Sequence, residues 1–326
     1  MRALILAGGL GTRLRPLTNT RPKHLLPIAN RPHIEHVFDL LQRHDISEAV
    51  LLTSYLADAF EAPIAAAEAR GFAVEVTHEA EPLGTAGALK HAEAFVDDET
   101  FLAFNGDILT DIDLDALIAF HRDRSAVGTI FLTPVEDPSR FGVVPTDERG
   151  RVEAFIEKPS AEDAPTNLIN AGIYVLEPSV LDRIPAGDVY SAERQLFPQL
   201  VEDDAGLFAL ALDGYWLDIG TPASLLQANL DTLTGAYAPP GAGAVRADAN
   251  IVDETAMVAD DARLTSACLG AGVVVSAGAS IAESVLLDRV DIGRGATVER
   301  SILGEGARVR PGAVVSERTI ADGDEV

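Results

Sequence analysis

The chain has 326 residues, 47% of them hydrophobic, which is enough for one large α/β domain and a smaller second one. Its formal net charge of −26 argues against nucleic acid as a partner, because phosphates demand a basic surface. Cys268 is the single cysteine, which excludes an intramolecular disulfide and argues against thiol chemistry or a zinc cluster.

Up to about Leu233, short β-branched runs alternate with amphipathic helical patterns. This alternation is typical of a Rossmann-like, mostly parallel sheet with crossover helices, and it predicts an α/β domain over residues 1–235. The expected strands are Arg2–Ala7, Ala49–Thr53, Phe72–Thr77, Thr100–Asn105 and Val127–Leu132. The expected helices are Pro32–His44, Leu56–Arg70, Thr85–Phe95 and Leu114–Arg122.

A stretch rich in proline and glycine follows Tyr237, and it predicts a linker over residues 236–250. Beyond it, aliphatic residues recur in hexads with small residues between them. They are Val252, Val258, Leu264, Val275, Ile281, Leu287, Ile292, Val298, Leu303, Val309 and Val315. This spacing predicts a hexapeptide-repeat parallel β-helix of about four coils over residues 251–326. Irregular antiparallel β-structure is the alternative, but a period of two fits poorly.

A glycine-rich segment follows the first expected strand. It reads Leu6-Ala-Gly-Gly-Leu-Gly-Thr-Arg13, and Lys23 comes shortly after it. Its glycines let the backbone approach a triphosphate, with amide N–H groups as donors, while Arg13 and Lys23 supply positive charge. The spacing matches neither the dinucleotide fingerprint nor the Walker loop. By itself, the segment is also consistent with a tight turn between a strand and a helix.

Two aspartates follow short apolar runs. Asp107 comes just after the expected strand that ends at Asn105, which places it at the carboxyl edge of the sheet, where ligands of open α/β folds bind. Asp218 ends a second short run. Two such carboxylates can hold Mg²⁺ together with phosphate oxygens and water. Each aspartate alone is equally consistent with a turn or a helix cap.

Lysine is scarce in this chain and occurs only at Lys23, Lys90 and Lys158. Lys23 and Lys158 fall in motifs where anionic substrates are expected, whereas Lys90 is expected to be a solvated helix residue. The acidic, lysine-poor composition is consistent with a salt-adapted host, whose proteins keep a hydrated carboxylate surface. A GC-rich genome that favours arginine over lysine explains it equally well.

Seven blocks in order resemble the sugar-1-phosphate nucleotidyltransferase family. The first is the glycine-rich segment, and the others begin at Glu81, Asn105, Arg140, Phe155, Ile169 and Trp216. The match covers roughly residues 1–233, and the hexapeptide tail resembles the left-handed β-helix of many members. The resemblance implies transfer of a nucleotidyl group from a nucleoside triphosphate to a sugar 1-phosphate, with Mg²⁺ as cofactor and pyrophosphate as the second product.

The resemblance also implies roles for individual residues. The catalytic set is Arg13, Lys23, Asp107, Lys158 and Asp218, with Asp107 and Asp218 as the Mg²⁺ ligands. The nucleotide-binding residues are Leu6, Ala7, Gly8, Gly9, Gly11, Thr12, Glu81, Pro82, Gly84 and Thr85. The sugar-binding residues are Gly106, Gly142, Glu157, Lys158, Asn170, Ala171 and Gly172. The attacking sugar phosphate is already an anion, so alignment and charge neutralisation suffice without a general base.

The block from His78 to Gly87 resembles the guanylyltransferases that act on mannose 1-phosphate more than the thymidylyl or uridylyl branches. Those branches usually carry a glutamine in this region, and here none lies between Gln42 and Gln195. We therefore expect GTP and mannose 1-phosphate as substrates. Thymidylyl or uridylyl transfer to glucose 1-phosphate is the alternative within this family.

Two other classes of function remain possible alternatives. The tail could transfer acetyl groups, but it contains no histidine to act as a base. A catalytically silent regulatory subunit that binds nucleotide sugar is the second alternative, but such relatives usually lose a phosphate- or metal-binding residue. We expect a cytoplasmic enzyme with neither signal peptide nor membrane span, which forms a homo-oligomer through the stacked coils of its tail.

Overall fold

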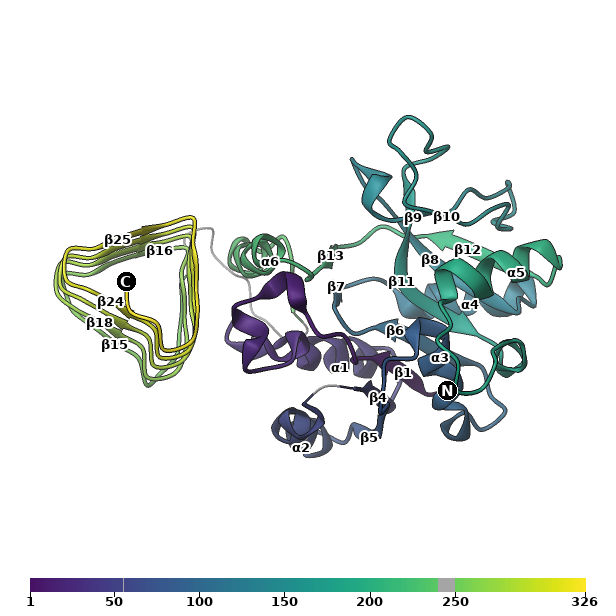
Figure 1. Ribbon diagram of the computed structural model, residues 1–326, viewed down its shortest axis with the longest axis horizontal. Helices are drawn as coiled ribbons and strands as arrows, with labels where there is room; N and C mark the ends of the chain where they lie inside the picture. The colour runs from purple at the N-terminus through teal and green to yellow at the C-terminus, as the bar shows by residue number, and fades with distance from the viewer. Residues whose placement is uncertain (55, 240–249) are drawn as a thin grey trace. The chain divides into compact units, whose positions relative to one another are not determined.

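The computed structural model describes residues 1–54, 56–239 and 250–326 (Figure 1). The chain forms two compact units. The first consists of Met1–Gly9 and Val37–Trp216, and the second of Leu10–His36 and Leu217–Val326. Most of the predicted linker lies outside the described residues, and the predicted domain boundaries stay a prediction. The division places part of the glycine-rich segment in the same unit as the tail.

The first unit contains a nine-stranded mixed sheet in which parallel pairs predominate at its centre. Strands β1, β4, β5 and β6 run parallel to one another, and β11 pairs antiparallel with β6. The strands are β1 (Ala3–Leu6), β4 (Glu48–Thr53), β5 (Ala73–His78), β6 (Phe101–Asn105), β8 (Gly128–Pro134), β9 (Gly142–Val143), β10 (Ile156–Glu157), β11 (Leu168–Leu176) and β12 (Leu207–Ala211). The predicted α/β fold class is therefore confirmed.

The remaining regular elements of the α/β part are short strands and six α-helices. The short strands are β2 (Pro27–Ile28), β3 (Arg31–Pro32), β7 (Ile108–Thr110) and β13 (Trp216–Asp218). The helices are α1 (His33–Arg43), α2 (Glu61–Glu68), α3 (Gly84–His91), α4 (Leu114–Arg124), α5 (Phe197–Glu202) and α6 (Pro222–Thr234). Within the described residues, no helix combines the length and hydropathy that a membrane crossing needs.

Two predicted helices are shorter than the sequence pattern suggested. Leu56 has a φ of 49°, which is left-handed backbone, so the helix cannot begin there. A 3₁₀ turn over Ala57–Phe60 precedes α2 instead. The helix predicted over Thr85–Phe95 ends at His91, and a separate 3₁₀ turn follows it. The boundaries of the other predicted strands and helices shift by one or two residues, as is usual for element ends.

The second unit contains a parallel β-helix built from stacked coils. Figure 1 shows these coils end-on as a triangle, and its sides are sheets of five, four and four strands. The strands are β14 (Ile251–Val252), β15 (Met257–Val258), β16 (Arg263–Thr265), β17 (Cys268–Leu269), β18 (Val274–Val275), β19 (Ser280–Ala282), β20 (Val285–Leu286), β21 (Asp291–Ile292), β22 (Thr297–Glu299), β23 (Ile302–Leu303), β24 (Arg308–Val309), β25 (Val314–Ser316) and β26 (Thr319–Ile320). The stacked parallel strands confirm the predicted β-helix.

The repeat of the β-helix differs from the predicted hexads in two details. Hydrogen bonds between neighbouring coils join residues 17 apart, one fewer than three hexads. One inward ladder accordingly runs through Leu269, Leu286 and Leu303, and the predicted Leu287 is also buried but lies next to this ladder. Val252 was predicted to point inward but is 41% exposed, because the first coil has a neighbour on one side only.

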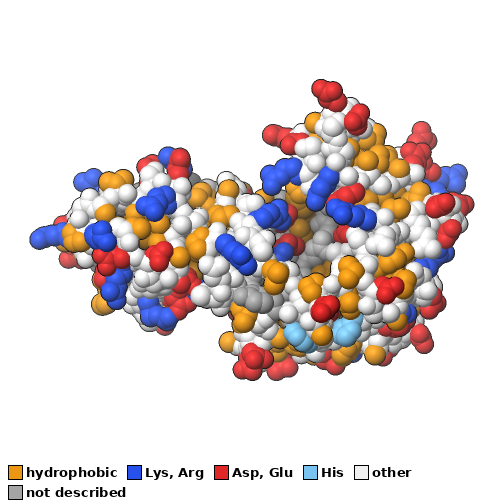
Figure 2. Space-filling model, in the orientation of Figure 1, with side chains coloured by type: hydrophobic (Ala, Val, Ile, Leu, Met, Phe, Trp, Pro, Cys, Tyr) orange, Lys and Arg blue, Asp and Glu red, His pale blue; other side chains and the backbone are white. Residues whose placement is uncertain are grey.

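The β-helix carries surface charges of both signs and the single, buried cysteine. Acidic and basic side chains are mixed over the visible face of the β-helix (Figure 2). Within the β-helix, Arg300 pairs with Glu317 and Arg310 pairs with Glu325. Cys268 is buried, and burial raises the pKa of its thiol to about 12. A thiol that stays protonated at neutral pH is a poor nucleophile.

Candidate active site

The start of the glycine-rich segment is held by the central sheet of the first unit. The backbone N–H of Ala7 donates to Leu52 O at 2.8 Å, and the N–H of Gly106 donates to Leu6 O at 3.0 Å. These groups of Leu6 and Ala7, which were predicted to meet the nucleotide, are therefore already used within the sheet. Gly8 comes next, and a Cβ there would lie 2.8 Å from Ser54 Oγ. Only glycine fits this close approach without displacing Ser54.

Glu79 is a residue that the sequence analysis missed. Its side chain follows β5 and is buried, with 5% of the residue exposed. One carboxylate oxygen, Oε2, lies 3.5 Å from the position of a Cβ on Gly8, and the carboxylate accepts a hydrogen bond from the backbone N–H of Leu83. Burial raises the pKa of this carboxyl group. Glu79 thus joins the two segments that were predicted to hold the nucleotide, residues 7–9 and 81–85.

The second predicted nucleotide-binding segment leads into helix α3. Glu81 and Pro82 are exposed, and Gly84 has a φ of 75°. A Cβ on Gly84 would lie 2.8 Å from the carbonyl oxygen of Tyr190, so this turn also requires glycine. The hydroxyl of Thr85 donates to Glu193 Oε2 at 2.7 Å and accepts from the N–H of Ala192 at 2.8 Å. Both contacts fix the start of α3, so the hydroxyl of Thr85 has a structural role.

Most of the predicted sugar-binding residues lie on or next to the short strands β9 and β10 and the long strand β11. A Cβ on Gly142 would lie 3.2 Å from Glu157 Oε2, which places that carboxylate directly over the glycine. Lys158 has a φ of 51°, an uncommon conformation for a residue with a side chain. Its Nζ lies 3.5 Å from Glu157 Oε1, and its side chain is 57% exposed. The turn therefore presents a cation and a carboxylate together.

Asn170 and Gly172 on β11 continue this wall. Asn170 Oδ1 accepts from the N–H of Gly172 at 3.0 Å, and its Nδ2 donates to the hydroxyl of Tyr174 at 2.8 Å. Gly172 has a φ of 78°, and a Cβ there would lie 2.6 Å from Asn105 Nδ2. The neighbouring Ala171 accepts a hydrogen bond at 2.9 Å from Trp216 Nε1. These contacts fix the backbone at the predicted sugar site.

Tyr174 is a second residue that the sequence analysis did not assign. It is fully buried, and burial raises the pKa of its phenol well above the ordinary value. The negative charges of Glu193, Glu157 and Asp107 raise the same pKa further. The phenol is therefore neutral at physiological pH and lies within the electrostatic reach of both Asp107 and Glu157. Asp107 itself follows β6 and is half-buried in the turn that leads to β7.

The second unit holds the remaining predicted catalytic residues, Arg13, Lys23 and Asp218. Gly11 has a φ of 60°, and a Cβ there would lie 3.1 Å from the Cβ of Lys23, so the segment folds back on itself at this glycine. The hydroxyl of Thr18 closes the same turn by donating to Gly11 O at 2.7 Å. Thr12 and Arg13 are exposed in the 3₁₀ turn Thr12–Leu14. Two cations and an aspartate thus come from one unit.

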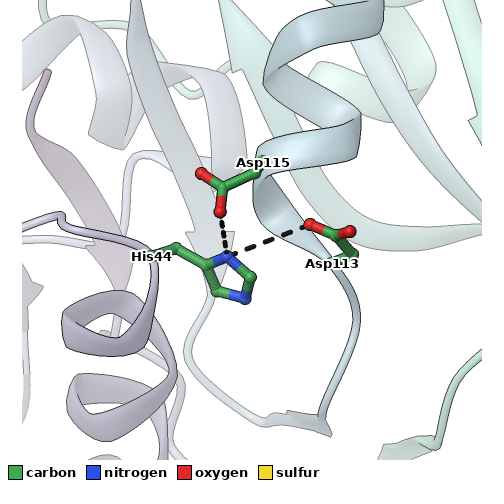
Figure 3. Close-up of side chains that lie close together, drawn as sticks. All are labelled: His44, Asp113 and Asp115. Atoms are coloured by element: carbon green, nitrogen blue, oxygen red, sulfur yellow. Dashed lines mark hydrogen bonds and ion pairs between the residues drawn. The ribbon is translucent and has the colours of Figure 1, made fainter.

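A group of side chains that could bind a metal ion lies elsewhere, at the end of α1 and the start of α4 (Figure 3). Among the described residues, His44, Asp113 and Asp115 bring their ligand atoms within 4.8 Å of one another. Asp113 also caps α4 by accepting from the N–H of Ala116 at 3.0 Å. His44 Nδ1 lies 2.9 Å from Asp115 Oδ2, and the two aspartate side chains are 64% and 73% exposed. The hydrogen bond between His44 and Asp115, together with the helix cap at Asp113, accounts for this group.

Comparison with known proteins identifies the family. The model of the nucleotidyl transferase family, described as "Nucleotidyl transferase", matches residues 2–235, and that of a "GMPPB C-terminal domain" matches residues 247–326. The chain belongs to the nucleotidyl transferase family. Members of this family generally use a divalent metal ion, a nucleoside triphosphate and a sugar 1-phosphate.

Several relatives of this nucleotidyltransferase are named mannose-1-phosphate guanylyltransferases. It is 38% identical over 291 residues to the mannose-1-phosphate guanylyltransferase of Mycobacterium tuberculosis, which covers 89% of this chain and 80% of that protein. It is 43% identical over 229 residues to the mannose-1-phosphate guanylyltransferase catalytic subunit beta of Drosophila melanogaster, covering 69% of this chain and 61% of the subunit. The chain thus matches less than two thirds of the fly subunit's length.

Solved structures resemble about 70% of this nucleotidyltransferase. HddC from Yersinia pseudotuberculosis, complexed with GMP-PN, aligns with a TM-score of 0.60 at 28% identity, over 70% of this chain and 97% of that one. A putative glucose-1-phosphate thymidylyltransferase from Bacillus anthracis, in complex with a sucrose, aligns with a TM-score of 0.62 at 26% identity, over 70% of this chain and 94% of that one.

Proposed function

We propose that this chain catalyses the reaction of GTP with mannose 1-phosphate to give GDP-mannose and pyrophosphate. The family supports the reaction class, and the names of the relatives support the nucleotide and the sugar. The structural observation that carries the choice of guanine is the buried carboxylate of Glu79 between Gly8 and Leu83. Thymidylyl or uridylyl transfer to glucose 1-phosphate is the reaction against which this choice is tested.

A carboxylate at this position suits guanine for a chemical reason. Ionised glutamate only accepts hydrogen bonds, and its two oxygens can receive two parallel donors. The Watson–Crick edge of guanine presents two adjacent donors, N1–H and N2–H₂, whereas thymine and uracil present one donor between two acceptors. The Oε1 atom of Glu79 has no hydrogen-bond partner among the described residues, but it is buried, so the proposal requires neighbouring groups to shift when guanine binds. A glutamine at this position would offer a mixed donor and acceptor instead.

The remaining roles follow from charge. We assign the triphosphate to Arg13 and Lys23, and the phosphate of the sugar to Lys158, whose Nζ is exposed beside Glu157. Asp107 and Asp218 offer two carboxylates, a donor set that fits a hard divalent cation, and we propose that they bind Mg²⁺. When bound, Mg²⁺ neutralises charge that develops on the phosphate oxygens.

In this proposal, the side chains and backbone of the protein position the two substrates. Arg13 and Lys23 hold the triphosphate, and Lys158 orients the attacking phosphate opposite the pyrophosphate leaving group. Asn170 and the backbone beside Gly142 and Gly172 orient the sugar hydroxyls, because β11 holds these groups rigidly. The neutral phenol of Tyr174 fixes the side chain of Asn170 by accepting its amide hydrogen bond. No proton needs to be removed from the attacking phosphate.

Assembly and location complete the proposal. We propose a homo-oligomer that forms through the β-helix, which static light scattering of the full chain tests directly. A cytoplasmic location accords with the supply of its nucleotide and sugar phosphate substrates. Fractionation of cells that produce the chain checks this location.

The experiment for the proposed function is direct product identification. Full-length protein is incubated with GTP, mannose 1-phosphate and MgCl₂, and the products are separated and weighed by mass spectrometry. We expect GDP-mannose and pyrophosphate in equal amounts, and we expect EDTA to stop their formation. Binding of GDP-mannose without any turnover would support a silent regulatory subunit and would refute the proposed enzyme.

A further inference from the structure

The segment between Arg13 and Lys23 contacts the β-helix through two consecutive residues. Arg21 Nη2 donates to Glu305 Oε2 at 2.5 Å and to Asp322 Oδ2 at 3.1 Å. The hydroxyl of Thr20 donates to the same Asp322 oxygen at 2.5 Å. All of these residues belong to the second unit. One guanidinium nitrogen thus joins the segment that carries both proposed triphosphate ligands to two carboxylates of the tail.

The carboxylates of Glu305 and Asp322 also make contacts within the β-helix that do not involve Arg21. Asp322 Oδ1 accepts from the backbone N–H of Glu305 at 2.7 Å, across two stacked coils. The other oxygen of Glu305, Oε1, pairs with Arg289. The side chains of Arg21, Glu305 and Asp322 are 21%, 27% and 19% exposed, so the ion pairs are shielded more than an ordinary surface pair. Partial burial and a fixed geometry are the conditions under which such pairs matter.

A second set of contacts lies a few residues beyond Lys23. Asn30 Nδ2 donates to Leu269 O on β17 at 2.6 Å. The fully buried Asn229 of α6 accepts from the N–H of Ala29 at 2.9 Å and donates to Pro27 O at 3.1 Å. Lys23 begins the 3₁₀ turn Lys23–Leu25, two residues after Arg21 and before this second set of contacts. The backbone that carries Lys23 is therefore held on both sides by contacts with the C-terminal part of the second unit, which are those of Arg21 and Asn30 with the β-helix and those of Pro27 and Ala29 with α6.

We infer that the β-helix is a positioning element for the triphosphate-binding segment, and that Arg21 is the positioning residue through which it acts. The tail carries carboxylates, which cannot themselves bind a triphosphate, but they hold Arg21 and so restrict the backbone on which Lys23 stands. This role adds to assembly, and it rests on the proposed nucleotidyl transfer. Loss of the contact loosens Lys23 without removing it, so nucleotide binding and transfer weaken together.

The test compares variants of the full chain. Arg21→Ala removes the guanidinium, whereas Arg21→Lys keeps a cation that can reach the same two carboxylates. The double variant Glu305→Gln with Asp322→Asn removes the partners instead. Arg300→Ala is the matched control, because Arg300 also pairs with a carboxylate of the β-helix, Glu317, at 2.9 Å. For each variant, kcat/KM for the nucleotide and hydrogen exchange of residues 10–26 are measured.

We expect Arg21→Ala and the double carboxylate variant each to lower kcat/KM for the nucleotide about tenfold. The combination of all three changes should lower it no further, because both sides of one contact are then removed. Arg21→Lys should recover most of the loss, and Arg300→Ala should behave as the unchanged protein. Hydrogen exchange of residues 10–26 should quicken in the two impaired variants only.

Hydrogen exchange separates this inference from the proposed reaction, because it does not depend on activity. Unchanged exchange and unchanged kcat/KM in Arg21→Ala would overturn the positioning role. An additive loss in the combined variant would overturn it as well, since the residues would then act independently. If exchange quickens in the two impaired variants but no nucleotide is transferred by any protein, the contact stands and the proposed function fails.

Discussion

Arg13 Nη2 lies 4.0 Å from Asp218 Oδ2, and both side chains pack against the bare Cα of Gly220. A Cβ at this glycine would lie 2.5 Å from Arg13 Nη2 and 2.7 Å from Asp218 Oδ1. Gly220→Ala should therefore displace the ends of both side chains while leaving the fold intact. We expect kcat to fall about tenfold or more with little change in melting temperature. Normal kcat in a folded variant would show that neither group needs its present position.

The two proposed metal ligands give the largest expected effect on turnover. Asp107→Asn and Asp218→Asn should each lower kcat by at least about 100-fold, because each removes one of two carboxylates that hold a charge-neutralising cation. Asp115→Asn is the control, since Asp115 belongs to the exposed group with His44 that could also bind a metal ion. Turnover is measured at saturating Mg²⁺. Near-normal turnover of either active-site variant would remove that residue from the metal site.

Lys158 and Lys90 allow a matched comparison of two lysines. The side chain of Lys158 at the proposed sugar site is 57% exposed. Lys90 on helix α3 was expected to be solvated, but its side chain is only 16% exposed and its Nζ pairs with Glu93 at 2.7 Å. Lys158→Ala should raise KM for the sugar phosphate about tenfold or more, because a charge-assisted hydrogen bond to the phosphate is lost. KM for GTP should change much less. Lys90→Ala should leave both constants unchanged, and an equal effect of the two variants would contradict the assignment.

The ionised carboxylate of Glu79 should destabilise the folded protein at neutral pH. Because its pKa in the folded chain lies above the unfolded value, the folded state binds this proton more tightly, and ionisation favours unfolding. The cost is absent below the pKa of glutamate in the unfolded chain and is complete above the raised pKa of the folded chain. Glu79→Gln should therefore raise the melting temperature at pH 7 by about 2 °C. The gain should vanish towards pH 4 in thermal scans, and a lower melting temperature at both pH values would contradict this account.

Much of the fold was predictable because local patterns decide it. Buried parallel strands such as β1 and β6 are continuous apolar runs, and the aliphatic spacing of the tail indicates stacked coils. The direction of β11 was not predictable, because it depends on long-range pairing with β6. The 17-residue coil was missed because one residue is absent from a corner of each turn, where Glu283 and Arg300 adopt positive φ.

Some residues of the candidate site were likewise predictable from the sequence, and others were not. The scarcity of lysine drew attention to Lys23 and Lys158, but nothing local shows that Glu79 is buried, since it stands in a polar run that looks solvated. Its burial comes from the packing of β5 beside Gly8. Arg21 gave no signal either, because its partner Glu305 lies 284 residues away in the sequence. Contacts of this kind appear only when the chain is folded.

The central claim is that the chain selects guanine through Glu79 and transfers the nucleotide to mannose 1-phosphate. The most direct test measures kcat/KM for GTP, dTTP and UTP with mannose 1-phosphate and with glucose 1-phosphate, for the unchanged protein and for Glu79→Gln. We expect GTP with mannose 1-phosphate to be the best pair, by about 10⁴-fold over the pyrimidine nucleotides, because a base with the wrong edge leaves buried polar groups unpaired. The preference for mannose over glucose should be about tenfold, since one hydroxyl differs. Glu79→Gln should reduce the preference for GTP selectively. A large preference for dTTP or UTP, or an unchanged preference for GTP in Glu79→Gln, would contradict the account.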